Sequence, residues 1–404
     1  MFFIIKNQPK GRNNLIQNIS LGSLFDGIGG FPYAASFFGI RPVWASEILP
    51  DCISITKKRI PEMIHLGDIT QIDGSRISPV DIITFGSPCQ GLSITGNRLG
   101  LADERSGLFT EAIRIITEIQ EATNGKYPQF AVWENVPGAL SSAGGCDFMA
   151  VLEAFTKSKI PMPCSGRWAR AGMVRSSRAD LAWCVYDAQY FGTAQRRRRV
   201  FLVADFTGKR SGQILFVPKS LRRYFAEGGT PRQGITACSQ NNSGVAIEIL
   251  NDQGGSSISI ENQDISPTLR CETHGHLPII APAPMSDNGQ LKAWGFDLQQ
   301  ITSKLNHTTM KPVQPTLCAA SSPHVVTYLQ NAESSHHIAR RLTPMECERL
   351  QGYPDGWTEQ GHDGKIISDT RRYQMLGNSI AVPCVTYIMQ GITECIEKEA
   401  ANGC

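Results

Sequence analysis

The chain has 404 residues, of which 41% are hydrophobic and 19% charged, with a formal net charge of +3. This length suits two domains, or one large domain with an insertion, and the composition is that of a globular rather than a disordered protein. No apolar run approaches the ~18 residues of a membrane helix, and the opening segment is too short for a signal peptide. We therefore expect a cytoplasmic protein with no membrane partner, while the nearly balanced charge neither requires nor excludes nucleic acid.

The twelve cysteines are scattered over the whole chain and form no CxxC pair. Because no paired Cys/His spacing indicates zinc and no secretion signal is recognised, we expect reduced thiols and no metal site. Most are interpreted as small core hydrophobes, which is the prediction for Cys146, Cys184, Cys347 and Cys384.

The first half of the chain alternates strand-like and helix-like segments. The first strand leads into a glycine turn and a helix that is expected from about Phe31, with Pro32 in its first turn, to just before Gly39. A second helix is predicted over residues 108–119 from apolar spacings of three and four. Strands are predicted over residues 21–25, 43–46, 80–85, 130–133 and 200–204. Such alternation predicts a parallel α/β sheet whose functional loops lie at the strand ends.

The composition changes between residues 206 and 340, where Gly, Ser, Asn, Gln, Pro and Thr rise. Residues 234–247, 266–280 and 314–328 each have a Thr, a polar stretch and then β-branched residues, so we interpret them as similar strand–loop units. Ordinary turn-rich β structure is the alternative. A capped helix is predicted after Thr343, and residues 373–392 are predicted to form a loop followed by an apolar helix.

The turn DGIGG, Asp26 to Gly30, follows a strand and precedes a helix, which is typical of a backbone site for a cofactor. Alone it is a weak signal, but Glu47 ends the next strand 20 residues after Gly27, where an acidic residue binds ribose hydroxyls in Rossmann-like folds. Position 32 is Pro, so the pattern is not GxGxxG and favours a compact nucleoside over a pyrophosphate cofactor. Asp68 is interpreted as an acceptor for an adenine amino group or as a helix cap.

The stretch FGSPCQGLS, residues 85–93, places Cys89 after Pro88 at the end of a predicted strand. Proline stiffens this loop, and a reactive thiol there would need nearby positive charge, although a buried cysteine is favoured for Cys89 alone. Glu134 ends the next strand, and adjacent strands would bring it to the same edge as a nucleophile and an acid. The alternative is that Glu134 caps the following turn.

Four consecutive arginines follow Gln195 and lead into a strand. Alternate residues of a strand share a face, so Arg197 and Arg199 are expected to point one way and Arg196 and Arg198 the other. One of these pairs would face the crevice near Cys89 and Glu134, and the other would face solvent or phosphates.

Together these segments resemble the cytosine-C5 DNA methyltransferase family. The resemblance covers about residues 20–390 outside the variable segment, and residues 171–192 resemble phage-borne or prophage members. It is carried, in the family's order, by LGSLFDGIGGF, ASEI, GDIT, FGSPCQGLS, ENVPG, AQRRRRVF, RRLTPMECERLQGYPDG and YQMLGNSIAVP.

The resemblance implies an α/β, Rossmann-like S-adenosylmethionine-dependent sheet with a smaller, mostly β or irregular target-recognition domain. The catalytic domain would span residues 18–205, completed by 368–404, and the target-recognition domain residues 206–367. The cofactor would be S-adenosyl-L-methionine, bound by Phe25, Asp26, Gly27, Ile28, Gly29, Gly30, Glu47, Ile48, Asp68, Ile69, Pro88, Asn378 and Ser379.

The implied activity is DNA (cytosine-5-)-methyltransfer to a flipped-out cytosine. Cys89 would attack C6, Glu134 would contact N3 and the exocyclic amine, and Arg197 would bind the base, with Arg199 at the matching basic position. Gln90, Ser93 and Thr316 would contact duplex DNA, although a second Thr-Leu pair at Thr268 competes with the one at Thr316. The implied protein is a bacterial or phage-encoded monomer associated with the nucleoid, and a restriction endonuclease is its partner if it belongs to a restriction–modification pair.

Three other readings stay open: a tRNA cytosine-C5 methyltransferase, a folate-dependent enzyme of the thymidylate synthase kind, and a DNA-binding protein with a dead site. The long variable region favours DNA over RNA, and the glycine turn with its two carboxylates argues against the folate enzyme. The DNA target and the role of residues 1–17 are not predicted. The repeated strand–loop units suggest the hypothesis that more than one target sequence is recognised.

Overall fold

The computed structural model describes residues 19–87, 107–216 and 338–402, together with Leu269 and six short strand segments between residues 247 and 329. The sequence-predicted residues Pro88, Cys89, Gln90, Ser93 and Thr316 lie outside these described residues.

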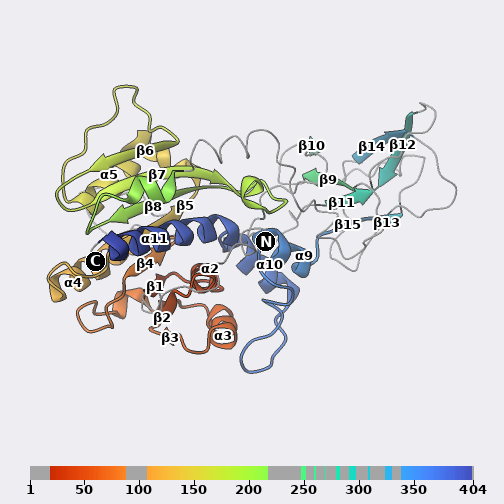
Figure 1. Cartoon of the computed structure of the whole chain (residues 1–404). Helices are drawn as coiled ribbons and strands as arrows, with labels where there is room; N and C mark the ends of the chain where they lie inside the picture. The colour runs from red at the N-terminus through yellow and green to blue at the C-terminus, as the bar shows by residue number, and fades with distance from the viewer. Residues whose placement is uncertain are drawn as a thin grey trace, which may run out of the picture.

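The body of the protein is built on an eight-stranded sheet in the order β3-β2-β1-β4-β5-β8-β7-β6 (Figure 1). The first five of these are parallel, and β8, β7 and β6 are antiparallel to their neighbours. The strands are β1 (Ser20–Leu24), β2 (Arg41–Ser46), β3 (Ile64–His65), β4 (Ile82–Phe85), β5 (Phe130–Asn135), β6 (Ala171–Arg175), β7 (Asp180–Asp187) and β8 (Arg198–Asp205).

Helices cover both faces of this sheet. Buried side chains of α4 and α5 pack in one hydrophobic cluster, and those of the other helices pack in a second cluster on the opposite face. The helices are α2 (Gly30–Ser36), α3 (Pro50–Arg59), α4 (Gly107–Ala122), α5 (Cys146–Thr156), α6 (Ser211–Leu215), α9 (Pro344–Gln351), α10 (Asp369–Asn378) and α11 (Val382–Asn402), with short 3₁₀ turns η2 (Ile69–Gln71), η4 (Pro137–Leu140), η5 (Ser142–Gly145) and η6 (Ala188–Phe191).

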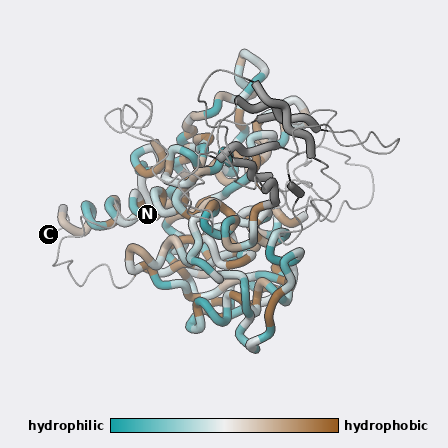
Figure 2. The backbone as a smooth tube through the Cα atoms, turned by 90° about the vertical axis from the view of Figure 1, so that its right-hand side faces the viewer, coloured by the Kyte–Doolittle hydropathy of each residue, from teal (hydrophilic) through white to brown (hydrophobic). Residues whose placement is uncertain are grey.

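The alternation of strand side chains explains this three-layer arrangement. Along β5, Phe130 and Val132 belong to one cluster, whereas Ala131 and Trp133 belong to the other. Successive strand residues point to opposite faces, so a strand that is apolar throughout must be covered on both sides. Figure 2 shows hydrophobic stretches running through this body and hydrophilic ones alternating with them. The expected α/β, Rossmann-like architecture is confirmed.

A smaller β region lies beyond α9 and α10, at the end of the molecule away from α4 (Figure 1). It contains a five-stranded sheet in the order β10-β9-β11-β15-β13 and the pair β12-β14, all antiparallel. Each of the three similar sequence segments runs into one of these strands: β9, β11 and β14. The strands are β9 (Ile247–Asn251), β10 (Ser259–Ile260), β11 (Ile279–Pro282), β12 (Leu291–Phe296), β13 (Thr308–Thr309), β14 (His324–Leu329) and β15 (Ile338–Arg341).

Two local expectations are wrong. The strand predicted over residues 200–204 is β8, but it runs antiparallel to β5 because β7 and β8 form a hairpin that reverses the chain. Residues 373–378, predicted as loop, belong to α10, although Gly377 and Asn378 are poor helix formers. These two residues occupy the last positions of the helix, where the penalty is smallest.

The helix predicted after Thr343 is confirmed with its cap. The Thr343 hydroxyl accepts a hydrogen bond from the Glu346 backbone N–H at 3.2 Å, and the Glu346 carboxylate accepts one from the Thr343 N–H at 2.7 Å. Cys347 and Leu350 of this helix are fully buried in the same cluster as Leu21 of β1. The predicted boundary at residue 367 is untested, but this packing favours a boundary near Arg341, before α9.

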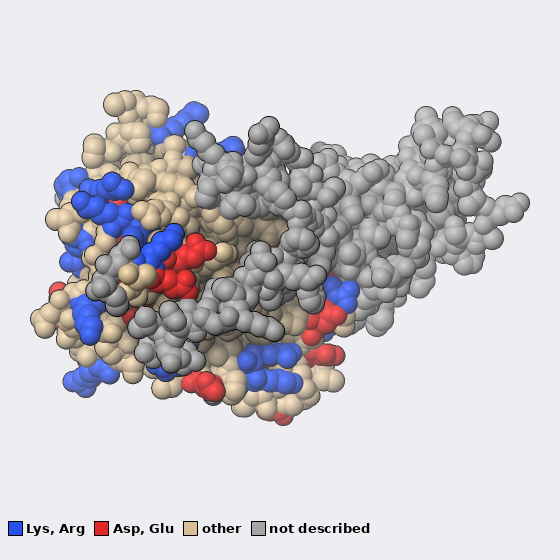
Figure 3. Space-filling view, in the orientation of Figure 1, with Lys and Arg blue, Asp and Glu red and all other residues tan. Residues whose placement is uncertain are grey.

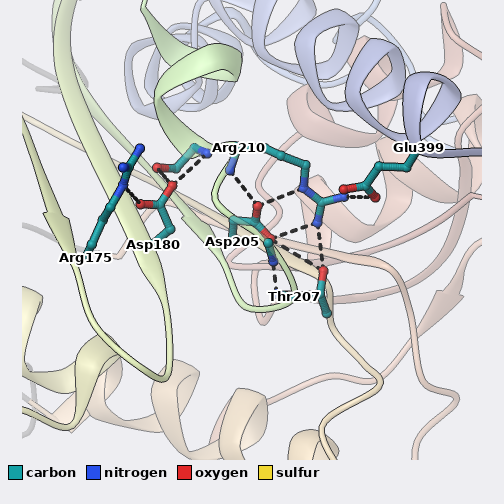
Figure 4. A network of polar contacts seen from close by, with 8 residues as sticks. Arg175, Asp180, Asp205, Thr207, Arg210 and Glu399 are labelled. Carbon is teal, nitrogen blue, oxygen red and sulfur yellow. Dashed lines mark hydrogen bonds and ion pairs between the residues drawn. The ribbon is translucent and has the colours of Figure 1, made fainter. Parts of the chain in front are cut away.

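The last helix, α11, is joined to the far end of β8 by a polar network (Figure 4). Asp205 accepts hydrogen bonds from Arg210 Nε and Nη2, both at 2.8 Å, and Arg210 Nη1 forms an ion pair with Glu399 of α11. No single helix among the described residues is long and apolar enough to cross a bilayer, although α10 and α11, bent by 41° at their junction, together reach that length and composition.

Candidate active site

Those expected functional residues of β1, β5 and β8 that the structure describes lie at one edge of the eight-stranded sheet. The parallel strands β1 to β5 end there, and β8 begins there because it is antiparallel to β5. The chain leaves β1 toward β2 on one side and reaches β4 on the other, so the strand order reverses between β1 and β4. Crevices at such reversal points are the usual ligand sites of open α/β sheets.

The glycine turn after β1 is held by Glu47. Its Oε2 accepts a hydrogen bond from the Gly27 N–H at 2.7 Å, and its Oε1 accepts bonds from the N–H groups of Ile48 and Leu49 at 2.8 and 3.0 Å. Gly27 has a φ of 58°, and a Cβ built on it would meet no atom within 4 Å. This left-handed backbone conformation favours glycine, and the described residues leave the space beside Gly27 open to a ligand.

Asp26 is the neighbouring carboxylate, and its side chain is buried without a hydrogen-bond partner on either oxygen. Burial raises its pKa from 3.8 to about 7, the Ser23 hydroxyl nearby partly opposes this, and the negative charge of Glu47 adds to it. The Ser23 hydroxyl is itself buried without a hydrogen-bond partner. The turn thus contains polar atoms that the described protein residues leave unsatisfied.

Two further residues fit a nucleoside beside this turn. Ile48 is 66% exposed, which is unusual for isoleucine and leaves an apolar face next to Glu47. The exposed Asp68 accepts a hydrogen bond from the Thr70 N–H at 2.9 Å through Oδ1, so the helix-cap interpretation is confirmed for that oxygen. An apolar surface, carboxylate acceptors and free space at Gly27 together suit a compact nucleoside ligand.

The last sequence motif folds back onto the helix that follows the glycine turn. Ser379, the residue after Asn378, hydrogen-bonds through its hydroxyl to the Tyr353 hydroxyl at 2.5 Å. A Cβ on Gly30 would lie 2.5 Å from that same Tyr353 oxygen, so only glycine permits this approach. Trp357 Nε1 donates to the Ile28 carbonyl at 2.9 Å.

Tyr353 and Trp357 were missed as site residues by the sequence interpretation. Their signal was the segment GYPDGW after the capped helix, where two large aromatic residues lie among turn residues.

Glu134 lies at the end of β5 and is almost completely buried. Its Oε1 forms an ion pair with Arg199 Nε at 3.0 Å. Burial raises the pKa of Glu134 above its ordinary value, and the charges of Arg199 and Arg197 only partly offset this. A Cβ on Gly86 would lie 3.2 Å from Glu134 Oε2, so the backbone after β4 passes directly beside the carboxyl group.

The loop that carries Cys89 begins at a fixed point on β5. Trp133 Nε1 donates to the Ser87 hydroxyl at 3.1 Å, and Asn135 Nδ2 donates to the Ser87 carbonyl at 3.2 Å. Ser87 is therefore anchored on both sides of Glu134. Cys89 itself, two residues later, lies outside the described residues, so its expected role stays a prediction.

The arginine run alternates as predicted. Arg197 is buried and Arg199 partly buried, whereas Arg196 and Arg198 are exposed. Arg199 reaches Glu134, but Arg197 does not extend into open space: its Nη2 donates to the carbonyls of Gly377, at 3.0 Å, and Ser379. The expected contact of Arg197 with a base stays a prediction.

Among the described residues, no group of three or more His, Cys, Asp or Glu side chains is arranged to hold a metal ion. Lys and Arg form several separate patches, interspersed with Asp and Glu, over the described surface seen in Figure 3. On the face drawn there, these local groups of Lys and Arg are the candidates for phosphate contacts.

Comparison with known proteins gives a family match over nearly the whole chain. The sequence model described as C-5 cytosine-specific DNA methylase matches residues 19–394. The "DNA N-6-adenine-methyltransferase" of Escherichia phage P1 is 28% identical over 96% of this chain, which spans 63% of that protein's length. The "Type II methyltransferase M1.ScrFI" of Lactococcus lactis subsp. cremoris is 26% identical, and the match covers 93% of this chain and 78% of the Lactococcus protein.

A solved structure shares the fold. The crystal structure of the S. pombe Dnmt2 methyltransferase superposes with a TM-score of 0.55 at 17% sequence identity, covering 94% of this chain and 99% of that one. At this identity the likeness concerns the architecture.

Proposed function

The chain belongs to the C-5 cytosine-specific DNA methylase family, and we propose that it transfers a methyl group from S-adenosyl-L-methionine to C5 of a flipped-out cytosine in duplex DNA. This proposal rests chiefly on the buried ion pair between Glu134 and Arg199. The pair lies beside the backbone at Gly86, three residues before Cys89. A carboxyl group with a raised pKa, held by an arginine, is suited to give a proton to a ring nitrogen.

The proposed chemistry begins with the Cys89 thiolate. Cytosine C5 is a poor nucleophile, so the thiolate adds to C6 while Glu134 holds a proton at N3, which makes C5 enamine-like. After C5 has been methylated, a base removes its proton and the thiolate leaves, which restores the ring. Cys89 follows Gly86 by three residues, and three residues of extended chain span at most about 11 Å. This short reach supports a thiol near Glu134.

The proposed cofactor site is the glycine turn with Phe25, Asp26, Gly27, Glu47 and Ile48, closed by Asn378 and Ser379. S-adenosyl-L-methionine, when bound, supplies the electrophilic methyl group. Glu47 holds the turn open through the Gly27 N–H, Ile48 offers an apolar surface for the purine, and the buried Asp26 carboxyl favours a cationic ligand over a neutral one.

The target base must leave the duplex because C6 is inaccessible in a base-paired stack. Flipping costs a few kcal/mol, and loop closure over the base would offset part of that cost. Gln90 and Ser93 in the loop and Thr316 in the target-recognition region are the proposed DNA contacts. Residues 206–341, with the antiparallel strands β9 to β15, are the proposed target-recognition region, shorter than the span expected from sequence.

Methyl transfer to adenine N6 is the second candidate, because the phage relative carries that name. An exocyclic amine is already nucleophilic and needs no thiol adduct, so the two reactions place different demands on Cys89. Transfer to tRNA is the third. As accompanying proposals, the protein acts as a cytoplasmic, nucleoid-associated monomer, and a restriction endonuclease is its partner if it belongs to a type II pair, as the name of the Lactococcus relative suggests.

The decisive test combines tritium transfer with bisulfite sequencing. The purified chain is incubated with tritiated S-adenosyl-L-methionine and duplex DNA, with tRNA as a parallel substrate. We expect label in DNA, released on hydrolysis as 5-methylcytosine, and protection of specific cytosines in DNA from expressing cells. Label in N6-methyladenine or in tRNA alone would overturn the proposal.

The matched variants are Cys89→Ser and Cys164→Ser, the second changing an exposed thiol far along the chain. Cys89→Ser should abolish transfer while DNA binding persists, whereas Cys164→Ser should leave both unchanged. Full activity of Cys89→Ser would refute the nucleophile assignment. The hypothesis of several targets fails if the bisulfite map shows one sequence only.

A further inference from the structure

Arg197 is the most deeply buried arginine among the described residues, at 2% exposure. Its guanidinium donates from Nη1 to the Leu269 carbonyl at 3.3 Å and from Nη2 to the carbonyls of Gly377, at 3.0 Å, and Ser379. All three acceptors are main-chain groups. A single side chain therefore joins the start of β8 to two segments that lie 72 and more than 180 positions further along the chain.

Leu269 is the contact of the β region with this arginine. It is the only residue between β10 and β11 that the structure describes, and it is 2% exposed within the cluster that also contains Leu21 and Ile28. The Leu269 side chain is thus fixed in the core of the sheet domain while its carbonyl is held by Arg197. This places one point of the proposed target-recognition region at the candidate active site.

The other two acceptors belong to the segment that closes the proposed cofactor site. Ser379, whose carbonyl Arg197 holds, also bonds through its hydroxyl to Tyr353, which lies against Gly30 of α2. The guanidinium is therefore shared between the segment at Leu269 and the segment beside the glycine turn.

The hydrogen bonds leave little of Arg197 for a base. Recognition of a flat ligand by arginine uses two parallel N–H groups, either from Nη1 and Nη2 or from Nε and Nη2. Nη2 already donates to two carbonyls and Nη1 to one, so neither pair is free, although Nε has no acceptor among the described residues. Arg199 differs, because its side chain meets the carboxylate of Glu134 instead of the main chain of a distant segment. Arg197 and Arg199, which point to the same side at the start of β8, thus have different roles.

We propose that Arg197 is a positioning residue that ties the target-recognition region, at Leu269, and the last motif, at Gly377 and Ser379, to the edge of the sheet. It sets the register between the part that reads DNA and the part that holds the cofactor, without contacting the base through its terminal nitrogens. The inference rests on the proposed function for its consequence in catalysis, but not for the tether itself.

The test uses hydrogen–deuterium exchange of the full chain without DNA or cofactor. In Arg197→Met, which keeps volume and removes the donors, peptides that contain Leu269 and residues 377–381 should exchange roughly tenfold to a hundredfold faster, because charge-assisted hydrogen bonds are lost there. In Arg197→Lys, which keeps a charge, the increase should be smaller. Arg199→Met is the matched control and should leave both peptides as in the wild type.

Kinetics gives the second readout. Arg197→Lys should raise KM for duplex DNA and for S-adenosyl-L-methionine more than it lowers kcat, whereas Arg199→Lys should chiefly lower kcat. If Arg197→Met does not fold, Arg197→Lys decides alone.

Unchanged exchange in both peptides together with lost methyl transfer would overturn the proposal, and so would an increase spread evenly over the whole chain. If the wild-type chain transfers no methyl group to DNA, the proposed function fails, but the exchange experiment still decides the tether.

Discussion

The eight-stranded sheet has one edge at the carboxyl ends of its parallel strands and one at their amino ends, and buried carboxylates are stabilised differently at the two. At the edge where β8 ends, Asp205 accepts hydrogen bonds from Thr207, Gly208 and Arg210, the last through both main-chain and side-chain nitrogens. Burial would raise the pKa of Asp205, but hydrogen bonds and charge from Arg210 outweigh it and lower the pKa below its usual value. These donors hold the ionised form of Asp205.

At the opposite edge, Asp26 is also buried, but neither of its oxygens has a hydrogen-bond partner among the described residues, and its pKa rises to about 7. Ser23 Oγ and Arg197 Nε are also buried without partners. Unsatisfied buried polar groups lower stability, so they persist where a ligand or reaction uses them. The contrast indicates that one edge of the sheet supports the fold and the other is prepared for binding.

Replacing Glu134 by Gln should have the largest effect, because it acts at the edge prepared for binding. Gln keeps the shape but cannot supply a proton, so kcat should fall by about 10²–10⁴-fold, the usual range for a general acid. The measurement is steady-state methyl transfer to duplex DNA. Glu153→Gln is the control, since it removes a carboxylate of α5 that pairs with the exposed Lys159, and should leave kcat unchanged. Equal loss in both variants would contradict the assignment.

Replacing Asp205 by Ala should lower stability and leave kcat unchanged, because Asp205 lies at the edge that supports the fold. Removing one partner of a buried ion pair costs about 3–5 kcal/mol of the free energy of unfolding when the other charge is left unpaired. Arg210 keeps its pair with Glu399, so the lower end of that range is expected. Urea unfolding measures the loss, and kcat per folded molecule should stay at the wild-type value. A variant with normal stability and reduced kcat would break the comparison between the edges.

Asp26→Asn should change the pH dependence of stability. The pKa of Asp26 is raised from 3.8 to about 7, so the folded state favours the protonated carboxyl group. The resulting stabilisation of the folded state is fully present below about pH 4 and is lost as the pH rises through 7. A shift of about three units corresponds to roughly 4 kcal/mol. Without cofactor, wild-type stability should therefore fall between pH 4 and 7, and the variant should lack this fall and be more stable at pH 8.

The matched control for that experiment is Asp81→Asn at the opposite edge. Asp81 accepts hydrogen bonds from Ser20 N and Oγ at 2.9 and 2.6 Å and from Gln129 Nε2 at 2.9 Å. Its replacement should lower stability at pH 8, because established hydrogen bonds to a carboxylate are weakened. If the free energy of unfolding changed with pH in the same way for wild type and Asp26→Asn, ionisation of Asp26 would not destabilise the fold and the prediction would be wrong.

Local patterns in the sequence predicted most of the sheet domain and its candidate site. Apolar runs gave the positions of β1, β2, β4, β5 and β8, and the cap at Thr343 was readable because a capping box involves residues only three positions apart. Strand alternation likewise predicted that Arg197 and Arg199 share a face, and both are less exposed than Arg196 and Arg198. These features depend on short spacings along the chain.

The remaining features depend on distant partners and could not be predicted in this way. Nothing near Arg197 in the sequence indicates that its donors reach Leu269 and Gly377, because those acceptors are main-chain carbonyls, which every residue has. The antiparallel direction of β8 depends on the β7–β8 hairpin, which strand periodicity does not reveal. The role of Tyr353 follows from a glycine contact at Gly30, more than 300 residues away.

The smallest effect is expected from a pair of tryptophans, one at each edge. Trp357 donates through Nε1 to the Ile28 carbonyl at 2.9 Å, beside the glycine turn, and Trp44 donates to the Ser78 carbonyl at 2.8 Å, before β4. Both are buried, so changing either to Phe should lower the free energy of unfolding by about 1–3 kcal/mol through an unsatisfied carbonyl and a small cavity.

The two variants should separate in cofactor affinity, measured by isothermal titration with S-adenosyl-L-methionine. Trp357→Phe frees the Ile28 carbonyl inside the turn that holds the ligand, so affinity should fall several-fold, whereas Trp44→Phe should bind as the wild type does. Equal affinity in both variants would mean that the turn keeps its shape without Trp357. The two edges would then differ only in how they stabilise buried charge. Losing a hydrogen bond beside the glycine turn would affect cofactor binding no more than losing one at the opposite edge.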